Sequence, residues 1–243
     1  MSIAVVSPPV GSPSTASPYG IPGWFGKLPM LGDFASRRLP PAAVAVCDAW
    51  LSQGLSASQA QLGVQWLETY LSAPMWSFAW APGVADDSWW FGVCMPSVDA
   101  AGRYFPLLAA ATTHSPACLN APAAAMGNWY ARLSQGALGV LQPQATVEAF
   151  ESVLEQLPLP SPAANTRSPA GDSRADTGDP ARFEVDAAGW PAGGVPLSTV
   201  LAIRPAHSAW WTSTPNRQPR LAVTLCEGLP RETRFAQLLL GHL

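Results

Sequence analysis

Apolar residues first recur at helical spacing after Pro40 and Pro41, which suit the first turn of a helix because proline lacks the amide hydrogen that stays unpaired there. The positions that repeat every three or four residues, and so share one helix face, are Val44, Cys47, Leu51, Leu55, Ser58 and Leu62. A shorter helix is predicted from Gln65 to Ala73, because Pro74 disfavours helical backbone in the residue before it. The pattern therefore predicts two consecutive helices, the first with a single buried stripe.

Three aromatic-rich runs follow, and each has the length and composition of a strand. They are MWSFAWAP (75–82), SWWFGVCMP (88–96) and RYFPLLAAAT (103–112). The last two runs are almost continuously apolar, which is typical of strands buried on both faces, so helices are expected on both sides of the sheet. The connections GVADDS and SVDAAG are short, and short connections predict an antiparallel meander.

Helical spacing returns twice in the second half of the chain, at Met126, Tyr130, Leu133 and Ala137 and then at Val147, Phe150, Leu154 and Leu157. Beyond these helices, STVLAIR (198–204) and RLAVTLCEG (220–228) are predicted strands. PRETRFAQLLLGHL (230–243) is a predicted closing helix with Pro230 near its first turn. The expected fold is α/β, a three-layer α/β/α sandwich around a largely antiparallel meander sheet.

Two segments interrupt these patterns. Residues 1–20 and 158–181 are rich in Ser and Pro and have no apolar periodicity, which predicts a disordered lead and a flexible insert. They separate a main α/β domain at 21–157 from a C-terminal part at 182–243. The strands and helix of that part are expected to pack onto the main domain, because about 60 residues alone bury too little surface.

Composition and charge narrow the classes of function. Charged residues make up 12% of the chain and the net charge is −3, so binding to nucleic acid through phosphate neutralisation is not expected. The four cysteines lie far apart, with no C-x-x-C pair and no histidine at zinc spacing, so no metal is expected and the thiols suit a reducing cytoplasm. The chain shows no basic, apolar leader and no run of about 20 apolar residues, so neither export nor membrane insertion is expected.

The stretch GWFGKLPMLGDFASRRLP (23–40) first invites a phosphate-loop interpretation, because it places Lys27 directly after a glycine. That motif requires an earlier glycine where the chain has Ile21 and a hydroxyl where it has Leu28. No nucleotide cofactor is therefore expected. Gly26 and Gly32 are predicted to give backbone freedom at turns.

In MPSVDAAGRYFPL (95–107), Ser97 and Asp99 could be a catalytic pair or could bond to the backbone of a hairpin loop. The structural interpretation also allows Asp99 to form an ion pair with Arg103 across the turn. A nucleophile needs a base, and none of the three histidines has a sequence context that supplies one. No catalytic residue is therefore predicted.

The opening stretch, MPSVDAAGRYFPL, and the tail features HSAWWT and EGLPRETRFAQLL together resemble the TagF family of proteins associated with type VI secretion systems. The resemblance runs from about Gly23 to Leu240 and is interrupted by the insert. It implies a longin-like α/β domain and a cytoplasmic, non-enzymatic regulator that represses type VI secretion after translation. The implied partner is the forkhead-associated scaffold protein of the system. A structural adaptor of the apparatus and a small α/β hydrolase or nucleotide-dependent switch are the alternatives.

A docking role for the opening stretch rests on two arginines beside an aromatic cluster, a composition typical of binding hot spots. Alternatively, the arginines are solvated at a helix start and the nearby aspartate caps a turn. The residues predicted to contact a partner are Trp24, Lys27, Asp33, Arg37, Arg38, Asp99 and Arg103. Eleven tryptophans also predict an exposed patch, because tryptophan is large and its N–H needs a partner, so that six of them are too many to bury fully. These six are Trp76, Trp80, Trp89, Trp90, Trp210 and Trp211.

Overall fold

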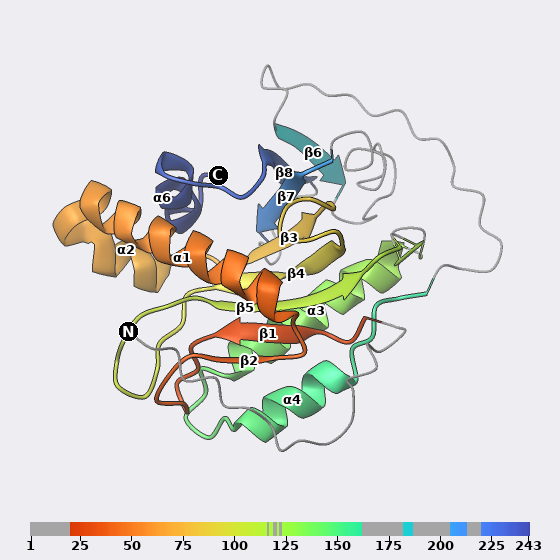
Figure 1. Cartoon of the computed structure of the whole chain (residues 1–243), viewed down its shortest axis with the longest axis horizontal. Coiled ribbons are helices and arrows are strands. Elements are labelled where there is room, and N and C mark those ends of the chain that lie inside the picture. Colours follow the sequence, from red (N-terminus) through yellow and green to blue (C-terminus); the bar gives the residue numbers. More distant parts are fainter. Residues whose placement is uncertain are drawn as a thin grey trace.

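A single antiparallel sheet organises the described part of the chain, which in this computed structural model comprises residues 20–115, 117–118, 121, 123–161, 182–186, 205–212 and 220–243 (Figure 1). The strands are β1 (Gly23–Gly26), β2 (Ala35–Arg37), β3 (Trp76–Trp80), β4 (Trp89–Met95), β5 (Leu107–Thr113), β6 (Arg182–Asp186), β7 (His207–Thr212) and β8 (Arg220–Glu227). Their spatial order is β2-β1-β5-β4-β3-β7-β8-β6, and every neighbouring pair is antiparallel. The C-terminal strands β7 and β8 therefore extend the same sheet beyond β3.

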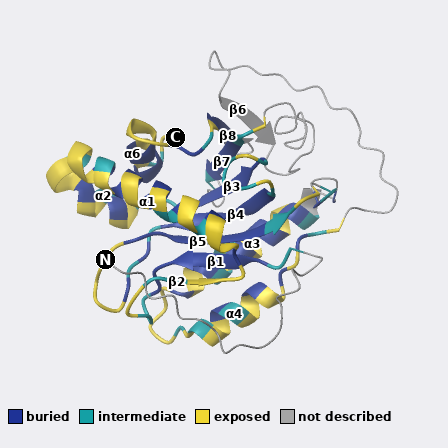
Figure 2. Cartoon of the chain, in the orientation of Figure 1, coloured by how far each residue is buried: buried dark blue, intermediate teal, exposed yellow. Residues whose placement is uncertain are grey.

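Helices pack against both faces of this sheet. They are α1 (Pro41–Leu62), a 3₁₀ turn (Gly63–Gln65), α2 (Trp66–Ser72), α3 (Ala123–Gly139), α4 (Val147–Glu155) and α6 (Thr233–Leu240). One core cluster joins α1, α2 and α6 to the sheet, and the other joins α3 and α4 to its opposite face (Figures 1 and 2). Alternate residues of β4 serve the two clusters, since Phe91 and Val93 enter one while Trp90 and Cys94 enter the other.

The predicted α/β class, with its largely antiparallel sheet, is confirmed. Helix α1 begins at Pro41, and of its predicted stripe Val44 and Leu62 are only partly buried. Helix α2 ends two residues before Pro74. Strand β4 is buried along its whole length, as the continuous apolar run predicts.

Strands β1 and β2 fall in a segment for which the sequence pattern predicts only loops and turns. The run GWFG is too short and too glycine-rich for an alternating pattern, and it becomes a strand because β5 and β2 pair with its two edges. Gly26 does have a positive φ, 134°, but within this strand. Gly32 has no positive φ, so its predicted conformational role is wrong.

The predicted exposed tryptophan patch is wrong. All ten tryptophans among the described residues are buried, the most exposed being Trp66 at 8%. Burial is possible because the wide sheet is covered on both faces and because several of the indole N–H groups reach internal acceptors. Trp50, Trp76 and Trp129, for example, donate to the backbone oxygens of residues 230, 238 and 157.

Several expectations lie outside the described residues. These are the strand predicted at 198–204, the disordered lead except residue 20, and the flexible insert from residue 162 onward. Within the described helices, none combines the length and the apolar character needed to cross a membrane.

Candidate functional site

Two loops, one from each long motif, pack against each other at one end of β1 and β5. The first (27–34) joins β1 to β2, and the second (96–106) joins β4 to β5. The amide of Ala100 donates to the oxygen of Leu31 at 2.8 Å, and the hydroxyl of Ser97 donates to the oxygen of Lys27 at 2.7 Å. The loops are therefore held together by their main chains as well as by side chains.

A buried ion pair joins the same two loops. Lys27 Nζ lies 2.8 Å from Asp99 Oδ2, and the two side chains are 5% and 0% exposed. Asp99 Oδ1 accepts the amide hydrogens of Ala101 and Arg103 at 3.0 and 2.9 Å, which fixes the tight turn that Gly102 completes with a φ of 78°. Burial raises the pKa of Asp99, but hydrogen bonds from Lys27 and Arg103 and the Lys27 charge outweigh burial and hold the pKa well below its usual value.

An aromatic cluster lines the ion pair. The Lys27 ammonium lies 4.7 Å from the centre of the Phe34 ring, a cation–π distance. Phe34 meets Phe105 edge to face at 4.7 Å, and Phe25 meets Phe105 at 5.9 Å. The lysine is thus paired with a carboxylate on one side and an aromatic face on the other, which is the kind of environment that a buried cation requires.

Arg103 connects this buried pair to the surface. Its Nε donates to Asp99 Oδ2 at 2.7 Å, which confirms the ion pair predicted across the turn. Its Nη2 donates to the oxygen of Gly32 at 2.5 Å and lies 3.9 Å from Asp33 Oδ1. The Arg103 and Asp33 side chains are 49% and 60% exposed, so together they form the solvent-facing end of the cluster.

Ser97 has a structural role, as the hairpin-loop interpretation predicts. It is 4% exposed, and its hydroxyl hydrogen is donated to Lys27. Its amide donates to the hydroxyl of Tyr70 at 3.0 Å, and that hydroxyl donates to the Ser97 oxygen at 2.9 Å. Since burial raises the pKa of Tyr70, this phenol stays protonated and keeps its donor. These bonds fasten the second loop to α2.

A second cluster surrounds Glu151 of α4. Its carboxylate accepts a hydrogen bond from the indole of Trp24 and an ion-paired hydrogen bond from the guanidinium of Arg38. Arg38 also donates through Nε to the oxygen of Pro22 at 2.9 Å and has a positive φ of 59°. The cluster therefore ties the end of β2 to α4. Glu151 was not identified from the sequence. It lies 113 positions from Arg38, and a glutamate in a helical pattern is usually solvated.

Comparison with known proteins places the chain in a family. The family model described as "TagF N-terminal domain, Type VI secretion system-associated" matches residues 23–157, more than half of the chain. The chain belongs to the TagF family. It is therefore a type VI secretion system-associated protein.

The TagF protein is also similar to a solved structure. The crystal structure of PA0076 from Pseudomonas aeruginosa PAO1 is 33% identical in sequence, with a TM-score of 0.64. The match covers 90% of this chain and 93% of PA0076, so the likeness extends beyond the N-terminal family segment. No curated protein matches the chain.

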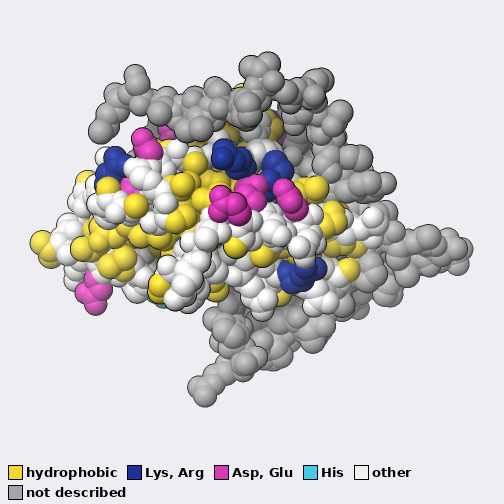
Figure 3. Space-filling model, turned by 90° about the horizontal axis from the view of Figure 1, so that it is seen from below, with side chains coloured by type: hydrophobic (Ala, Val, Ile, Leu, Met, Phe, Trp, Pro, Cys, Tyr) yellow, Lys and Arg dark blue, Asp and Glu magenta, His cyan; other side chains and the backbone are white. Residues whose placement is uncertain are grey.

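The seven residues predicted to contact a partner separate into three groups in this TagF protein. Trp24, Lys27 and Asp99 are buried, so in this conformation they support the surface rather than present it. Asp33 and Arg103 face solvent at the end of the ion-paired cluster, and Arg38 is partly covered by Glu151. Arg37 is exposed, and its guanidinium donates a hydrogen bond to the neighbouring Ser36 oxygen at 3.4 Å. Figure 3 shows basic and acidic side chains gathered on one face, with hydrophobic side chains beside them.

No group of three or more His, Cys, Asp or Glu side chains within the described ranges is arranged to hold a metal ion. The four cysteines are buried, and burial raises the pKa of Cys47 and of Cys94 to about 12. These two thiols therefore stay protonated near neutral pH and are weak nucleophiles.

Proposed function

We propose that this TagF protein is a non-enzymatic, post-translational repressor of type VI secretion that acts by binding a cytoplasmic scaffold, the forkhead-associated protein of the system. One observation carries the proposal. The two long motifs fold into one cluster whose interior, Lys27 with Asp99, is fully engaged in structure and whose outer end, Asp33 with Arg103, is presented to solvent. Such an arrangement holds surface groups in fixed positions for recognition by another protein.

The same cluster argues against a hydrolase. A serine nucleophile needs a hydroxyl free to approach a substrate and a base within hydrogen-bond reach. The hydroxyl of Ser97 is buried and donates to a backbone oxygen, and its neighbouring carboxylate, Asp99, accepts from Lys27 and Arg103. These groups have structural partners in place of catalytic ones.

Binding through this surface is expected to depend weakly on salt. The chain has few charged residues, 12%, and the exposed end of the cluster combines one acidic with one basic side chain. Attraction that depends on an excess of one charge is therefore small, and salt screens mainly long-range attraction between exposed charges.

The fold that the family resemblance implies is compatible with this proposal. We take the helices on both faces of the sheet to form the longin-like three-layer α/β/α sandwich that the resemblance implies. Such a scaffold supplies rigid elements on which surface loops can be held, and it hosts many unrelated functions, so the fold alone does not argue for repression.

The test combines secretion and binding. Deleting the gene should raise export of the secreted tube protein, and overproduction should silence export without lowering the amounts of the machine's components. A pull-down with the TagF protein should recover the scaffold at low and at high salt. If neither deletion nor overproduction changes secretion in a cell with a working system, the repressor proposal is wrong and the structural-adaptor alternative still stands.

A further inference from the structure

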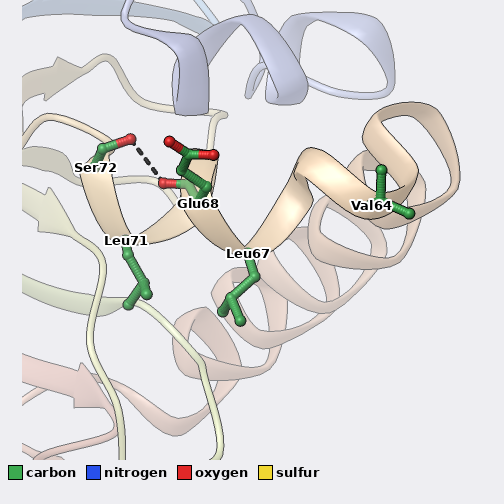
Figure 4. Close-up of a pocket in the computed structure, with 5 residues that line it drawn as sticks. All are labelled: Val64, Leu67, Glu68, Leu71 and Ser72. Carbon is green, nitrogen blue, oxygen red and sulfur yellow. Dashed lines mark hydrogen bonds between the residues drawn. The ribbon is translucent and has the colours of Figure 1, made fainter.

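The surface of α2 and the 3₁₀ turn before it is unusually apolar. Val64 is 101% exposed, Leu67 is 43% exposed and Leu71 is 61% exposed. With Glu68 and Ser72 they line one shallow hollow, here called the α2 face, and Figure 4 shows Leu67 and Leu71 projecting from the same side of the helix. Three large apolar side chains within eight positions form a continuous patch rather than scattered exposure.

These side chains are not needed for packing. Helix α2 buries Trp66 and Tyr70, which lie four residues apart and stack on each other at 5.1 Å between ring centres. Leu67 and Leu71 are each one position further along, and a step of one residue turns a side chain by about 100° around the helix axis. Polar residues of equal helix propensity, such as glutamine or lysine, would serve at these positions if the face met only water.

Only one polar side chain between positions 63 and 72 carries a charge that a partner could contact. The hydroxyls of Thr69 and Ser72 donate to carbonyl oxygens of their own helix, at 2.9 and 2.7 Å. Glu68 is the single charged residue between positions 63 and 72. Its carboxylate is exposed and forms no ion pair in the part of the chain that the structure describes. The α2 face therefore combines leucine and valine side chains with a single negative charge.

We propose that the α2 face is a docking surface for an apolar segment of a partner protein that places a lysine or arginine against Glu68. The inference rests on the proposed function, since it takes that partner to be the forkhead-associated scaffold. Apolar side chains exclude water at the centre of such a contact, and a charge at its edge sets register and selects against partners with the wrong sign.

A second copy of this chain does not fit the same surface. A symmetric contact centred on α2 would bring the two Glu68 carboxylates together, and the segment 63–72 supplies no cation to either of them. Like charges held close at an interface are unfavourable. The charge of the α2 face therefore favours a different, basic partner.

Tyr104 links the α2 face to the ion-paired loops. Its ring contacts the edges of Trp66 and Tyr70, with centres 6.2 and 5.6 Å apart, and it remains 37% exposed. Tyr104 directly follows Arg103 in the loop that the buried Asp99 holds in place. The second loop therefore positions an aromatic side chain beside α2, and tyrosine is enriched in binding hot spots.

The test measures, by calorimetry, the affinity of purified wild type and variants for the purified scaffold protein. Leu67→Glu with Leu71→Glu should weaken binding by about tenfold or more, the effect expected when central apolar anchors are lost. The matched control is Leu138→Glu with Leu141→Glu, a double change of two exposed leucines elsewhere that adds the same two charges. It should bind like the wild type. Glu68→Lys should also weaken binding, and Glu68→Gln should reduce whatever small salt dependence the wild-type contact has. Circular dichroism and melting curves establish that each variant is folded.

The results distinguish an error in the assignment of the α2 face from an error in the proposed function. If the wild-type protein neither binds the scaffold nor alters secretion, the proposed function is wrong, and this assignment of the partner is wrong with it. If the wild type binds but the Leu67 and Leu71 double variant binds equally well, only the α2 face is wrong. A wild-type dimer in light scattering that the double variant converts to a monomer would assign the face to a second copy and overturn the proposal.

Discussion

Lys27 Nζ and Asp99 Oδ2 lie 2.8 Å apart, and this contact joins two residues that are 72 positions apart in sequence and whose side chains are both shielded from solvent. Removing a carboxylate and an ammonium from water is costly, so such a pair is retained only where its geometry is good and its remaining donors and acceptors are satisfied. Here Asp99 also accepts two amide hydrogens and an arginine, and Lys27 faces an aromatic ring. The pair sets the mutual position of the two long motifs.

Breaking this pair from one side should destabilise the protein strongly. Lys27→Met leaves the buried Asp99 carboxylate with Arg103 as its remaining cationic partner, and we expect a loss of about 3 kcal/mol in the free energy of unfolding. Lys27→Met combined with Asp99→Asn should cost less than the two single changes added together, because the uncompensated charge is removed. Urea unfolding of all four proteins near neutral pH measures the coupling. Additive losses would show that the pair is not energetically coupled.

The same carboxylate should make stability depend on acid. Because the folded-state pKa of Asp99 is lowered, its ionised form stabilises the fold above the unfolded-state pKa of about 3.9, and this contribution is lost as the pH falls towards the folded-state pKa. The wild type should therefore lose stability relative to Asp99→Asn between about pH 5 and pH 2. Urea unfolding at several pH values measures the difference. Asp33→Asn, on the exposed side of the cluster, should show the same dependence of stability on pH as the wild type. If Asp33→Asn reduced that dependence as much as Asp99→Asn does, the effect would come from exposed charges.

Two glycines of the opening stretch should differ sharply in their tolerance of alanine. Gly26 has a φ of 134°, and a Cβ there would lie 2.1 Å from the oxygen of Pro106. Backbone strain of this kind costs about 1–3 kcal/mol, and the steric overlap adds to it, so Gly26→Ala should unfold at clearly lower denaturant. A Cβ at Gly32 meets nothing within 4 Å, so Gly32→Ala should have little effect. Equal midpoints for the two variants would contradict the geometry around β1.

Substitutions of Arg37 and Arg38 should have different effects, one on partner binding and the other on stability. Arg38→Glu places a carboxylate against Glu151 and removes the bond to the Pro22 oxygen, so it should lower the melting temperature by several degrees, as expected for a loss of about 1–2 kcal/mol in a chain of this size. Arg37→Glu should leave the melting temperature unchanged because its side chain is exposed. If the opening stretch docks to the scaffold, Arg37→Glu will still weaken the pull-down. Unchanged recovery of the scaffold by a folded Arg37→Glu protein would remove Arg37 from the contact.

The elements with strong local patterns could be predicted from the amino-acid sequence alone. The stripe of α1, its start at Pro41 and the end of α2 before Pro74 follow from helical spacing and from the chemistry of proline. The continuous apolar runs of β4 and β5 likewise predicted strands in the middle of a covered sheet, because only such strands bury both faces. The Asp99 turn could also be predicted, since its partner Arg103 is four residues away.

The remaining features of the fold depend on contacts between segments that are distant in the chain. Strands β1 and β2 have no local alternation and exist because β5 offers an edge for pairing. Segments far apart in the chain form the Lys27–Asp99 pair and the bonds of Trp24 and Arg38 to Glu151. They also bury every described tryptophan. Local patterns report which residues favour a helix, a strand or a turn, whereas burial and charge pairing depend on what the folded chain brings next to them.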